Sequence, residues 1–236
     1  MKISVVIAAK NEEAMLPDCI QSVLGFSDDV VLVNDMSTDA TVEVAKKYGA
    51  RVFDRKLDGF STQKNYGASK ANNDWVLILD ADERVSNKLS DELRRLKPSG
   101  KTAGYEIKFR NHIGKKWLRH GGLYPDPHVR LYDHRRAKYG KREVHETLDV
   151  DGGVGKLNND IIHFTYTNYA EYLAKVKKYA TLEAKWAEKK PSIIHPLRVF
   201  VDKYIVQKGI LDGAAGLISA AFLAYYQMII RREYKK

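Results

Sequence analysis

Cysteine is almost absent from this chain of 236 residues, and two glycine-rich signatures of nucleotide-binding loops are absent altogether. The single cysteine, Cys19, excludes an intramolecular disulfide and favours a reducing compartment, where we expect it to act as a small apolar residue. No G-x-G-x-x-G follows the first apolar run, which argues against a dinucleotide-binding enzyme. The sequence also lacks G-x-x-x-x-G-K-[ST], which argues against a P-loop NTPase.

Long apolar runs are scarce as well. Ile3–Ala9 is short and charged residues follow at once, so we expect a strand rather than a secretory signal peptide, and a cytoplasmic protein. One uncharged segment of eighteen residues, Gly213–Ile230, just has the length of a membrane span. Because Gln227 and several small residues weaken it, we favour two helices, within 196–209 and 213–230, that lie in the bilayer interface. A buried soluble helix or a homodimer contact is the alternative.

Acidic residues are fewer than basic ones, with 30 Asp and Glu against 40 Lys and Arg and a formal net charge of +10. From Asn168 onward thirteen basic residues accompany six acidic ones, so most of the excess lies in the last third. This asymmetry predicts an anionic partner, although a solvated basic face is the alternative. A nucleic-acid site would need exposed stacking aromatics, whereas the tyrosines of 169–179 follow a helical packing stripe. We therefore expect an anionic membrane surface and no nucleic acid.

Short apolar runs alternate with helical patterns in the first part of the chain. The runs typical of buried strands are Ile3–Ala8, Asp29–Val33 and Trp75–Leu79. The helical patterns lie near Glu12–Leu24, Asp39–Tyr48 and Ser61–Lys70. This alternation predicts an α/β fold with a mostly parallel sheet and helices on both faces. Ligands of such sheets bind beyond the carboxyl ends of the strands.

The remainder of the chain changes character twice. Between Gly104 and Phe164 it is richer in Gly, His, Tyr and Arg, and short strands are expected at Tyr105–Phe109, Val129–Tyr132 and Asp160–Phe164. From Asn168 the apolar residues recur at helical spacing. We therefore predict a domain at 1–166, with halves 1–100 and 101–166, followed by a helical extension at 167–236.

Carboxylates follow the predicted strands. Asp80 and Asp82 end the run WVLILDADE, and in an extended chain their side chains project to the same side. Two such oxygen ligands suit Mg²⁺ or Mn²⁺. The metal would keep open coordination positions for diphosphate oxygens and neutralise charge on a departing nucleoside diphosphate. Asp35, at the end of the second run, can accept the imide N–H of a uracil, and a neighbouring polar residue can cap the next helix.

The first strand exit, AAKNEE, places Asn11 or Glu12 where a nucleoside would lie. This exit is acidic, whereas a nucleotidyltransferase would need a basic, glycine-rich loop for a triphosphate, so that alternative is disfavoured.

Four elements stand in a fixed order along the chain: Asn11-Glu12, Asp35-Met36-Ser37-Thr38-Asp39, Lys64-Asn65-Tyr66-Gly67 and Asp80-Ala81-Asp82. In this order they resemble the family 2 glycosyltransferases, which have the GT-A fold, over roughly residues 1–100. Further segments are similar to the lipopolysaccharide-core glucosyltransferase branch: GGLYPDPHVRLY, REVHETL, DIIHFTY and KGILDGAAGLISAAFLAYY.

The resemblance implies an inverting, metal-dependent enzyme on the inner face of the cell membrane. It would move a hexose from a nucleotide diphosphate sugar, UDP in preference to GDP, to a lipid-linked or lipopolysaccharide-type acceptor. A polypeptide or polysaccharide acceptor is the alternative. Residues 1–100 would form the nucleotide-sugar half and residues 101–166 the acceptor half.

Individual site residues follow from the matched motifs and from their position at the strand ends. The expected donor contacts are Ala8, Asn11, Glu12, Asp35, Lys64, Asn65, Asp80 and Arg130, although a salt bridge is equally compatible with Arg130. The expected metal contacts are Asp80, Asp82 and His145.

Inverting transfer needs a carboxylate that takes the proton from the acceptor hydroxyl. Asp126 falls where the family places its base, and Glu146, beside His145, is the rival. The alternative for Asp126 is a turn carboxylate between two prolines.

Overall fold

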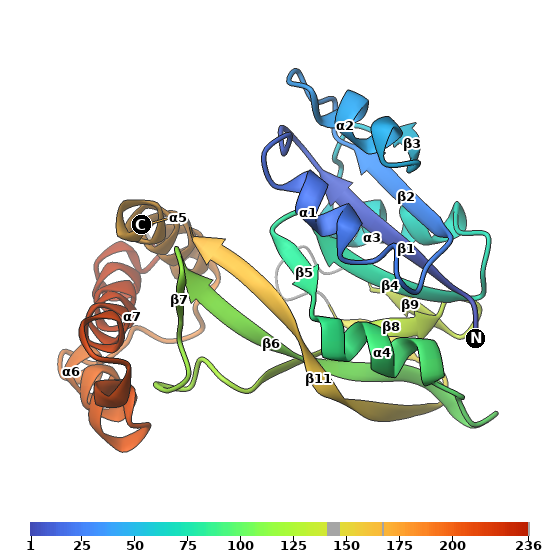
Figure 1. Cartoon of the computed structure of the whole chain (residues 1–236). Helices are drawn as coiled ribbons and strands as arrows, with labels where there is room; N and C mark the ends of the chain where they lie inside the picture. Colours follow the sequence, from blue (N-terminus) through green and yellow to red (C-terminus); the bar gives the residue numbers. More distant parts are fainter. Residues whose placement is uncertain (141–146, 167, 236) are drawn as a thin grey trace. The chain divides into compact units, whose positions relative to one another are not determined.

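The computed structural model describes residues 1–140, 147–166 and 168–235. These residues form two compact units (Figure 1). The first unit combines Met1–Phe109 with Pro127–Ile162, and the second combines Arg110–Asp126 with His163–Lys236. The functional division after residue 166 that the sequence suggests stays a prediction.

The first unit is built on a parallel half-sheet. Its strands are β1 (Ile3–Ala9), β2 (Asp29–Asn34), β3 (Arg51–Asp54) and β4 (Trp75–Asp80), in the spatial order β3-β2-β1-β4. All three neighbouring pairs are parallel, as the alternation of strands and helices predicted.

Beyond β4 the sheet is mixed. It continues with β8 (Asp126–Asp133), β6 (Thr102–Ile113), β11 (Gly153–Tyr166) and β5 (Glu83–Val85). Strand β8 runs antiparallel to β4, with Leu131 opposite Leu77, and this direction brings Arg130 toward the carboxyl end of β4. The short β7 (Lys116–Trp117) pairs with β6, and β9 (Ala137–Tyr139) pairs with β10 (Leu148–Val150) in a separate ladder.

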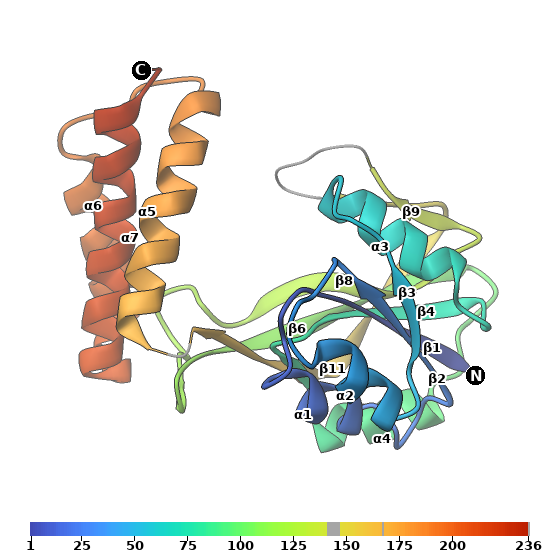
Figure 2. The same cartoon turned by 90° about the horizontal axis from the view of Figure 1, so that it is seen from above.

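Helices cover both faces of the parallel strands (Figure 2). Alternate strand residues point to opposite faces, so Val5 and Ile7 meet one set of helices while Val6 meets another. The first face carries α1 (Leu16–Gln21), α2 (Thr41–Lys47) and α4 (Asn87–Arg95). The second carries α3 (Phe60–Ser69) and the β9–β10 ladder. Helix α1 is shorter than the expected 12–24, because Pro17 lies in its first turn and the preceding loop makes other hydrogen bonds.

The second unit contains a packed helical bundle. It consists of α5 (Tyr169–Trp186), α6 (His195–Val201), the π-helix η1 (Asp202–Val206), the 3₁₀-helix η2 (Gly209–Asp212) and α7 (Ala214–Glu233). Helix α7 packs against both α5 and α6 (Figure 2). Its Ala215 contributes to the apolar cluster around Tyr172 and Val176, and its Ile229 and Ile230 meet Ala180 and Ala184 of α5 at the other end.

Asp212 fixes the start of α7. This buried carboxylate accepts the backbone N–H groups of Arg119 and His120, at 2.9 and 2.8 Å, and its other oxygen lies 2.9 Å from His120 Nδ1. The loop that follows β7 is thereby tied to the helical bundle. Among the described residues α7 is the one helix whose length and composition would suit a membrane span, and a third of its most apolar window is buried by the rest of the chain.

Gly67 allows α3 to approach the sheet closely, which yields a test of the fold. A Cβ atom at this position would lie 2.3 Å from Val6 Cγ1 and 2.9 Å from Val33 Cγ2. Branched side chains on buried strands cannot move aside easily, so Gly67→Ala should lower the free energy of unfolding by about 1–3 kcal/mol. Urea unfolding measures this. Gly100→Ala, where a Cβ meets nothing within 4 Å, is the control and should change stability little; equal effects would contradict the close packing.

Candidate active site

The carboxyl ends of β1, β2 and β4 meet at one edge of the sheet. In the strand register Ala8 lies opposite both Val33 and Asp80, and Ala9 lies opposite Asn34. The backbone N–H of Asp35 donates to Ala9 O at 2.9 Å. The polar residues that follow these strands are therefore neighbours. This is expected for a parallel sheet, whose ligands bind beyond the carboxyl ends of its strands.

An acidic turn occupies the end of β4. The strand ends at Asp80, Ala81 and Asp82 form the turn, and β5 begins at Glu83. The expectation of an extended Asp80–Asp82 segment is thus wrong in its local geometry, because Ala81 and Asp82 form the turn between β4 and β5. Glu83 is fully buried, and its Oε2 accepts the Asp80 N–H at 2.9 Å. Sequence reasoning missed Glu83, although the run Asp-Ala-Asp-Glu contained it.

Arg130 ties this acidic group to β8. Its Nη2 lies 3.0 Å from Glu83 Oε1 and 3.3 Å from Asp80 Oδ2. The salt-bridge alternative for Arg130 is therefore present, but in a largely buried setting rather than at the surface. Burial alone would lower the pKa of Arg130, yet Glu83 and Asp80 raise it overall, so the guanidinium stays charged.

The second guanidinium nitrogen of Arg130 is also informative. Nη1 is buried and has no hydrogen-bond partner among the described residues. Buried polar groups in proteins are nearly always satisfied, so this N–H group is a donor that a ligand or a water molecule can use.

Arg84 holds the acidic turn in place through hydrogen bonds to backbone carbonyl oxygens. Its Nη1 donates to the carbonyl oxygens of Ala81 and Glu83 at 2.6 and 2.9 Å, and its Nη2 donates to Met15 O at 2.6 Å. Cys19 of α1 lies beneath the same turn, 3.5 Å from Asp80 O. Burial raises the pKa of the Cys19 thiol, which stays neutral and acts as the expected small apolar residue.

The acidic turn has the donor set for a hard divalent cation. Carboxylate oxygens of Asp82 and Glu83 lie within 4.8 Å of each other, and Asp80 is next to them. Mg²⁺ and Mn²⁺ prefer such oxygen ligands, so these residues fit the metal that the sequence predicts. The other predicted contact, His145, and the rival base, Glu146, lie outside the described residues.

Asp35 stands at the end of β2 as a charged acceptor. Its Oδ1 accepts the Leu57 N–H at 2.9 Å, and its Oδ2 accepts the Lys10 ammonium at 3.1 Å. These hydrogen bonds, that of Leu57 first, hold the pKa of Asp35 below its usual value although burial acts in the opposite direction. A carboxylate has about four lone-pair sites, so Asp35 retains capacity for a further N–H donor.

Asn11 and Glu12 join the exits of β1 and β2. Asn11 has a positive φ of 55°, its N–H donates to Ser37 Oγ at 3.0 Å, and its Oδ1 accepts the Thr38 N–H at 2.8 Å. The Glu12 N–H donates to Thr41 Oγ1 at 2.8 Å. These contacts fix the loops at the ligand edge, while direct contact of either residue with a nucleoside stays a prediction.

The predicted donor residues of α3 have different environments. Asn65 binds the backbone of Tyr139 at both ends of its amide, donating to Tyr139 O at 2.9 Å and accepting the Tyr139 N–H at 3.0 Å. Its observed role is therefore to position β9. The Lys64 ammonium lies 5.2 Å from the centre of the Tyr139 ring, and Ala8 lies half-buried within β1.

Asp126 belongs to the second unit, at the start of β8. It is partly buried, and Asn111 Nδ2 donates to its Oδ2 at 3.1 Å. The same Asn111 meets His163, whose Nδ1 lies 2.9 Å from Asn111 Oδ1. Asn111 therefore orients the Asp126 carboxylate, and no motif in the sequence pointed to it because it comes from the distant strand β6.

The α/β architecture with a polar ligand edge at the ends of β1, β2 and β4 is the GT-A fold of glycosyltransferases. The family model described as glycosyl transferase family 2 matches residues 4–147. The chain belongs to this family, and it is a glycosyltransferase.

Similar proteins agree with this assignment. The chain is 28% identical to an uncharacterised glycosyltransferase of Rickettsia typhi, over 97% of this chain and 85% of the relative. It is 27% identical to the lipopolysaccharide core biosynthesis glycosyltransferase LpsC of Rhizobium meliloti, over 78% of this chain and 71% of LpsC. The crystal structure of S. aureus TarS superposes with a TM-score of 0.51 at 14% identity, covering 100% of this chain and 89% of TarS, which supports the fold.

The buried pair of Glu83 and Arg130 can be tested by a double-mutant cycle. Glu83→Gln leaves Arg130 facing an amide instead of a carboxylate, so the free energy of unfolding should fall by about 3–5 kcal/mol. Arg130→Gln should cost a similar amount, and the double variant should cost less than the sum. Urea unfolding provides the values. Glu106→Gln, at a pair with the exposed Lys156, is the control and should change stability by about 1 kcal/mol or less. Additive effects of Glu83 and Arg130 would contradict the coupling.

Proposed function

We propose that this glycosyltransferase transfers a hexose, with inversion, from a nucleotide diphosphate sugar to a lipid-linked or lipopolysaccharide-type acceptor, with Mg²⁺ or Mn²⁺ as its metal. UDP is the preferred nucleotide. The observation that carries the proposal is the acidic turn at the end of β4, where Asp80, Asp82 and Glu83 gather beside Arg130.

Each group has a part in this reaction. Asp82, with Asp80 and Glu83 beside it, would hold the metal, which when bound neutralises charge on the leaving diphosphate. Arg130 Nη1 supplies a buried cationic donor for a diphosphate oxygen. Asp35 would accept the imide N–H of uracil with an oxygen lone pair that Leu57 and Lys10 leave available. Lys64 would contact the ribose. Asn11 and Glu12 hold the loops after β1 and β2, where the nucleoside would bind, in a fixed conformation.

Asp126 is the proposed base. Its carboxylate would accept the proton of the acceptor hydroxyl as that oxygen attacks the anomeric carbon. The hydrogen bond from Asn111 supports this role, because it fixes the direction of one carboxylate oxygen. Glu146 is the alternative base.

The acceptor and the location of the enzyme rest on different observations. The relative LpsC is named for lipopolysaccharide core biosynthesis, and most of the excess positive charge lies from Asn168 onward. We propose an acceptor that carries a lipid or lipopolysaccharide core and an enzyme bound to the anionic inner face of the cell membrane. A homodimer would be compatible with this arrangement.

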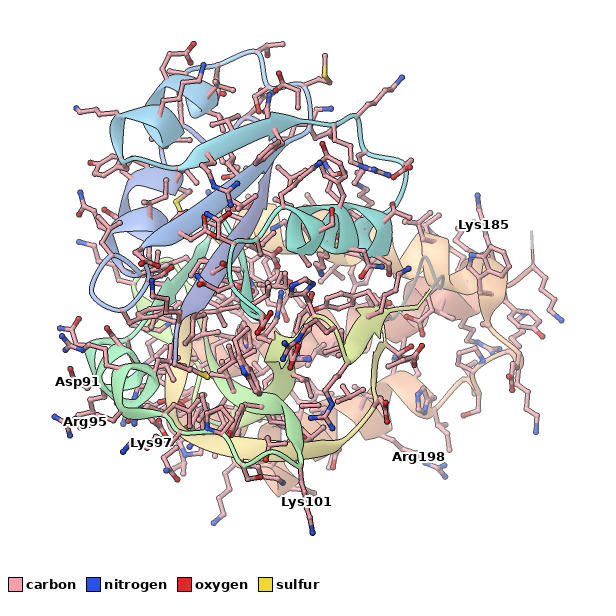
Figure 3. All side chains as sticks on the ribbon, turned by 90° about the vertical axis from the view of Figure 1, so that its right-hand side faces the viewer. Asp91, Arg95, Lys97, Lys101, Lys185 and Arg198 are labelled. Carbon is pink, nitrogen blue, oxygen red and sulfur yellow. The ribbon has the colours of Figure 1, made fainter. Side chains whose placement is uncertain are left out.

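Asp82→Asn tests the metal-binding turn. Sugar transfer and metal-dependent donor hydrolysis should fall at least about a hundredfold, because a neutral amide is a poor ligand for Mg²⁺ or Mn²⁺. The measurement is a screen of common UDP- and GDP-sugars with and without Mn²⁺. Asp91→Asn, at the surface of α4 (Figure 3), is the matched control and should retain full activity. Metal-independent transfer by the Asp82 variant would refute the site.

Asp126→Asn tests the base. Donor binding should be unchanged, while kcat should fall by about 10²–10⁴-fold because the amide cannot take up the proton. Stopped assays at saturating donor give kcat, and titration of the donor gives its affinity. Glu146→Gln discriminates between the two bases: if this variant alone loses turnover, the base is Glu146.

A further inference from the structure

A stripe of exposed aliphatic side chains runs along α6 and η1. Ile193 lies in the turn before α6, and Leu197, Val201 and Ile205 follow it at four-residue steps along α6 and η1, a spacing that favours one side of the segment. They are 77%, 65%, 44% and 54% exposed. Monomeric soluble domains rarely leave such a contiguous apolar surface uncovered, so the stripe indicates a binding surface.

The opposite side of the same segment is occupied. Pro196 is buried, Phe200 and Tyr204 are partly buried, and α6 packs along α7 (Figure 2). Because α7 packs against the inner side of this segment, it does not cover the exposed side chains of the stripe. Two further exposed aliphatic residues, Ile210 and Leu211, extend the surface into η2.

Basic residues surround the stripe. Between residues 189 and 211 the chain has five Lys or Arg and a single acidic residue, Asp202, whose carboxylate accepts from Gln207 Nε2 at 2.7 Å. Arg198 leaves α6 toward solvent (Figure 3) and Lys208 is exposed. Interleaved aliphatic and basic side chains of this kind suit the boundary between lipid headgroups and acyl chains.

A groove adjoins the end of this stripe. It has a volume of about 430 Å³, an apolar wall that includes Ile193 and Met228, and basic side chains from Lys190, Arg231 and Arg232. Arg231 is held by a hydrogen bond from its Nη1 to Pro191 O at 2.6 Å. An anionic headgroup could lie against the cations while its glycerol or acyl portion meets the apolar wall.

A second copy of the chain fits this surface less well. In a two-fold dimer the same patch meets itself, so the basic residues around the stripe would approach their own symmetry mates. An anionic lipid surface instead supplies the complementary charge, at about 1 kcal/mol for each Lys or Arg near the membrane.

We propose that the stripe formed by Ile193, Leu197, Val201 and Ile205 inserts into the headgroup region of an anionic phospholipid bilayer, and that the adjoining groove receives a lipid phosphate. This rests on the proposed function at a membrane surface and identifies the segment that makes the contact. The sequence predicts that helices within 196–209 and 213–230 both lie in the interface. We assign the main contact to the first segment, because α7 packs against α5 and α6 and exposes few large apolar side chains, Leu217 and Met228.

Vesicle flotation tests the stripe. The full chain, without donor or metal, is mixed with vesicles of phosphatidylglycerol and phosphatidylcholine in roughly equal parts. The wild-type chain should float with them and bind phosphatidylcholine vesicles weakly. Leu197→Gln with Ile205→Gln should weaken binding at least about tenfold, since two aliphatic side chains no longer leave water. The matched control, Leu24→Gln with Leu182→Gln, replaces two leucines that are 50% and 44% exposed and should bind normally.

The groove has its own pair of variants. Lys190→Gln with Arg232→Gln should weaken binding to the anionic vesicles and flatten its dependence on salt, with little effect on phosphatidylcholine. Arg95→Gln with Lys97→Gln removes two cations at the end of α4 (Figure 3) and is the control. Inorganic phosphate, compared with chloride at the same ionic strength, should not displace the chain if the site takes a lipid.

Several results would overturn the proposal. These are failure of the wild-type chain to float, equal binding by the stripe variant and its control, displacement by inorganic phosphate alone, or a solution dimer that the stripe variant converts to monomers. Asp82→Asn separates this proposal from the enzymatic one, because it should abolish transfer while flotation persists.

Discussion

The acidic turn after β4 depends on two arginines that enclose it from different directions. Arg84 binds the carbonyl oxygens of the turn and of Met15, and Arg130 binds the side chains of Glu83 and Asp80. Closely placed carboxylates repel one another, and a buried one such as Glu83 is tolerated only with a partner. The two guanidinium groups therefore allow a concentration of negative charge at the sheet edge that a divalent cation can bind.

The loops at the neighbouring strand ends are stabilised by another means. Asn11 and Glu12 exchange hydrogen bonds with Ser37, Thr38 and Thr41, so the exits of β1 and β2 form one unit. Asp35 lies within this unit as a charged acceptor. A rigid edge of this kind reduces the reorganisation needed when a nucleotide binds.

The parallel half-sheet and the position of its polar edge were predictable, because continuous apolar strands and the Asp-x-Asp that follows them are local patterns. The sequence did not identify Glu83, Arg84 and Asn111, since their roles arise from tertiary contacts. Arg84 donates to the backbone of Met15, just before α1, and Asn111 of β6 donates to Asp126 of the neighbouring strand β8. Asn65 shows that a residue in a recognised motif can also have a structural contact that the sequence does not reveal. It matches the family pattern, yet its amide is used by the backbone of Tyr139.

The C-terminal helices illustrate what composition alone leaves undecided. An uncharged run such as 213–230 is equally suited to lipid and to the interior of a bundle, and the difference lies in what its neighbours cover. The alanines and glycines that weakened it as a membrane span allow close helix packing: Gly216 lies so near the carbonyl of Gly209 that a Cβ there would be 1.8 Å from the oxygen. The segment before it, with larger aliphatic residues at four-residue steps, keeps them outside because α7 already occupies its inner side. Small residues thus mark the close helix contacts within the bundle, and large ones mark the face that we propose for lipid.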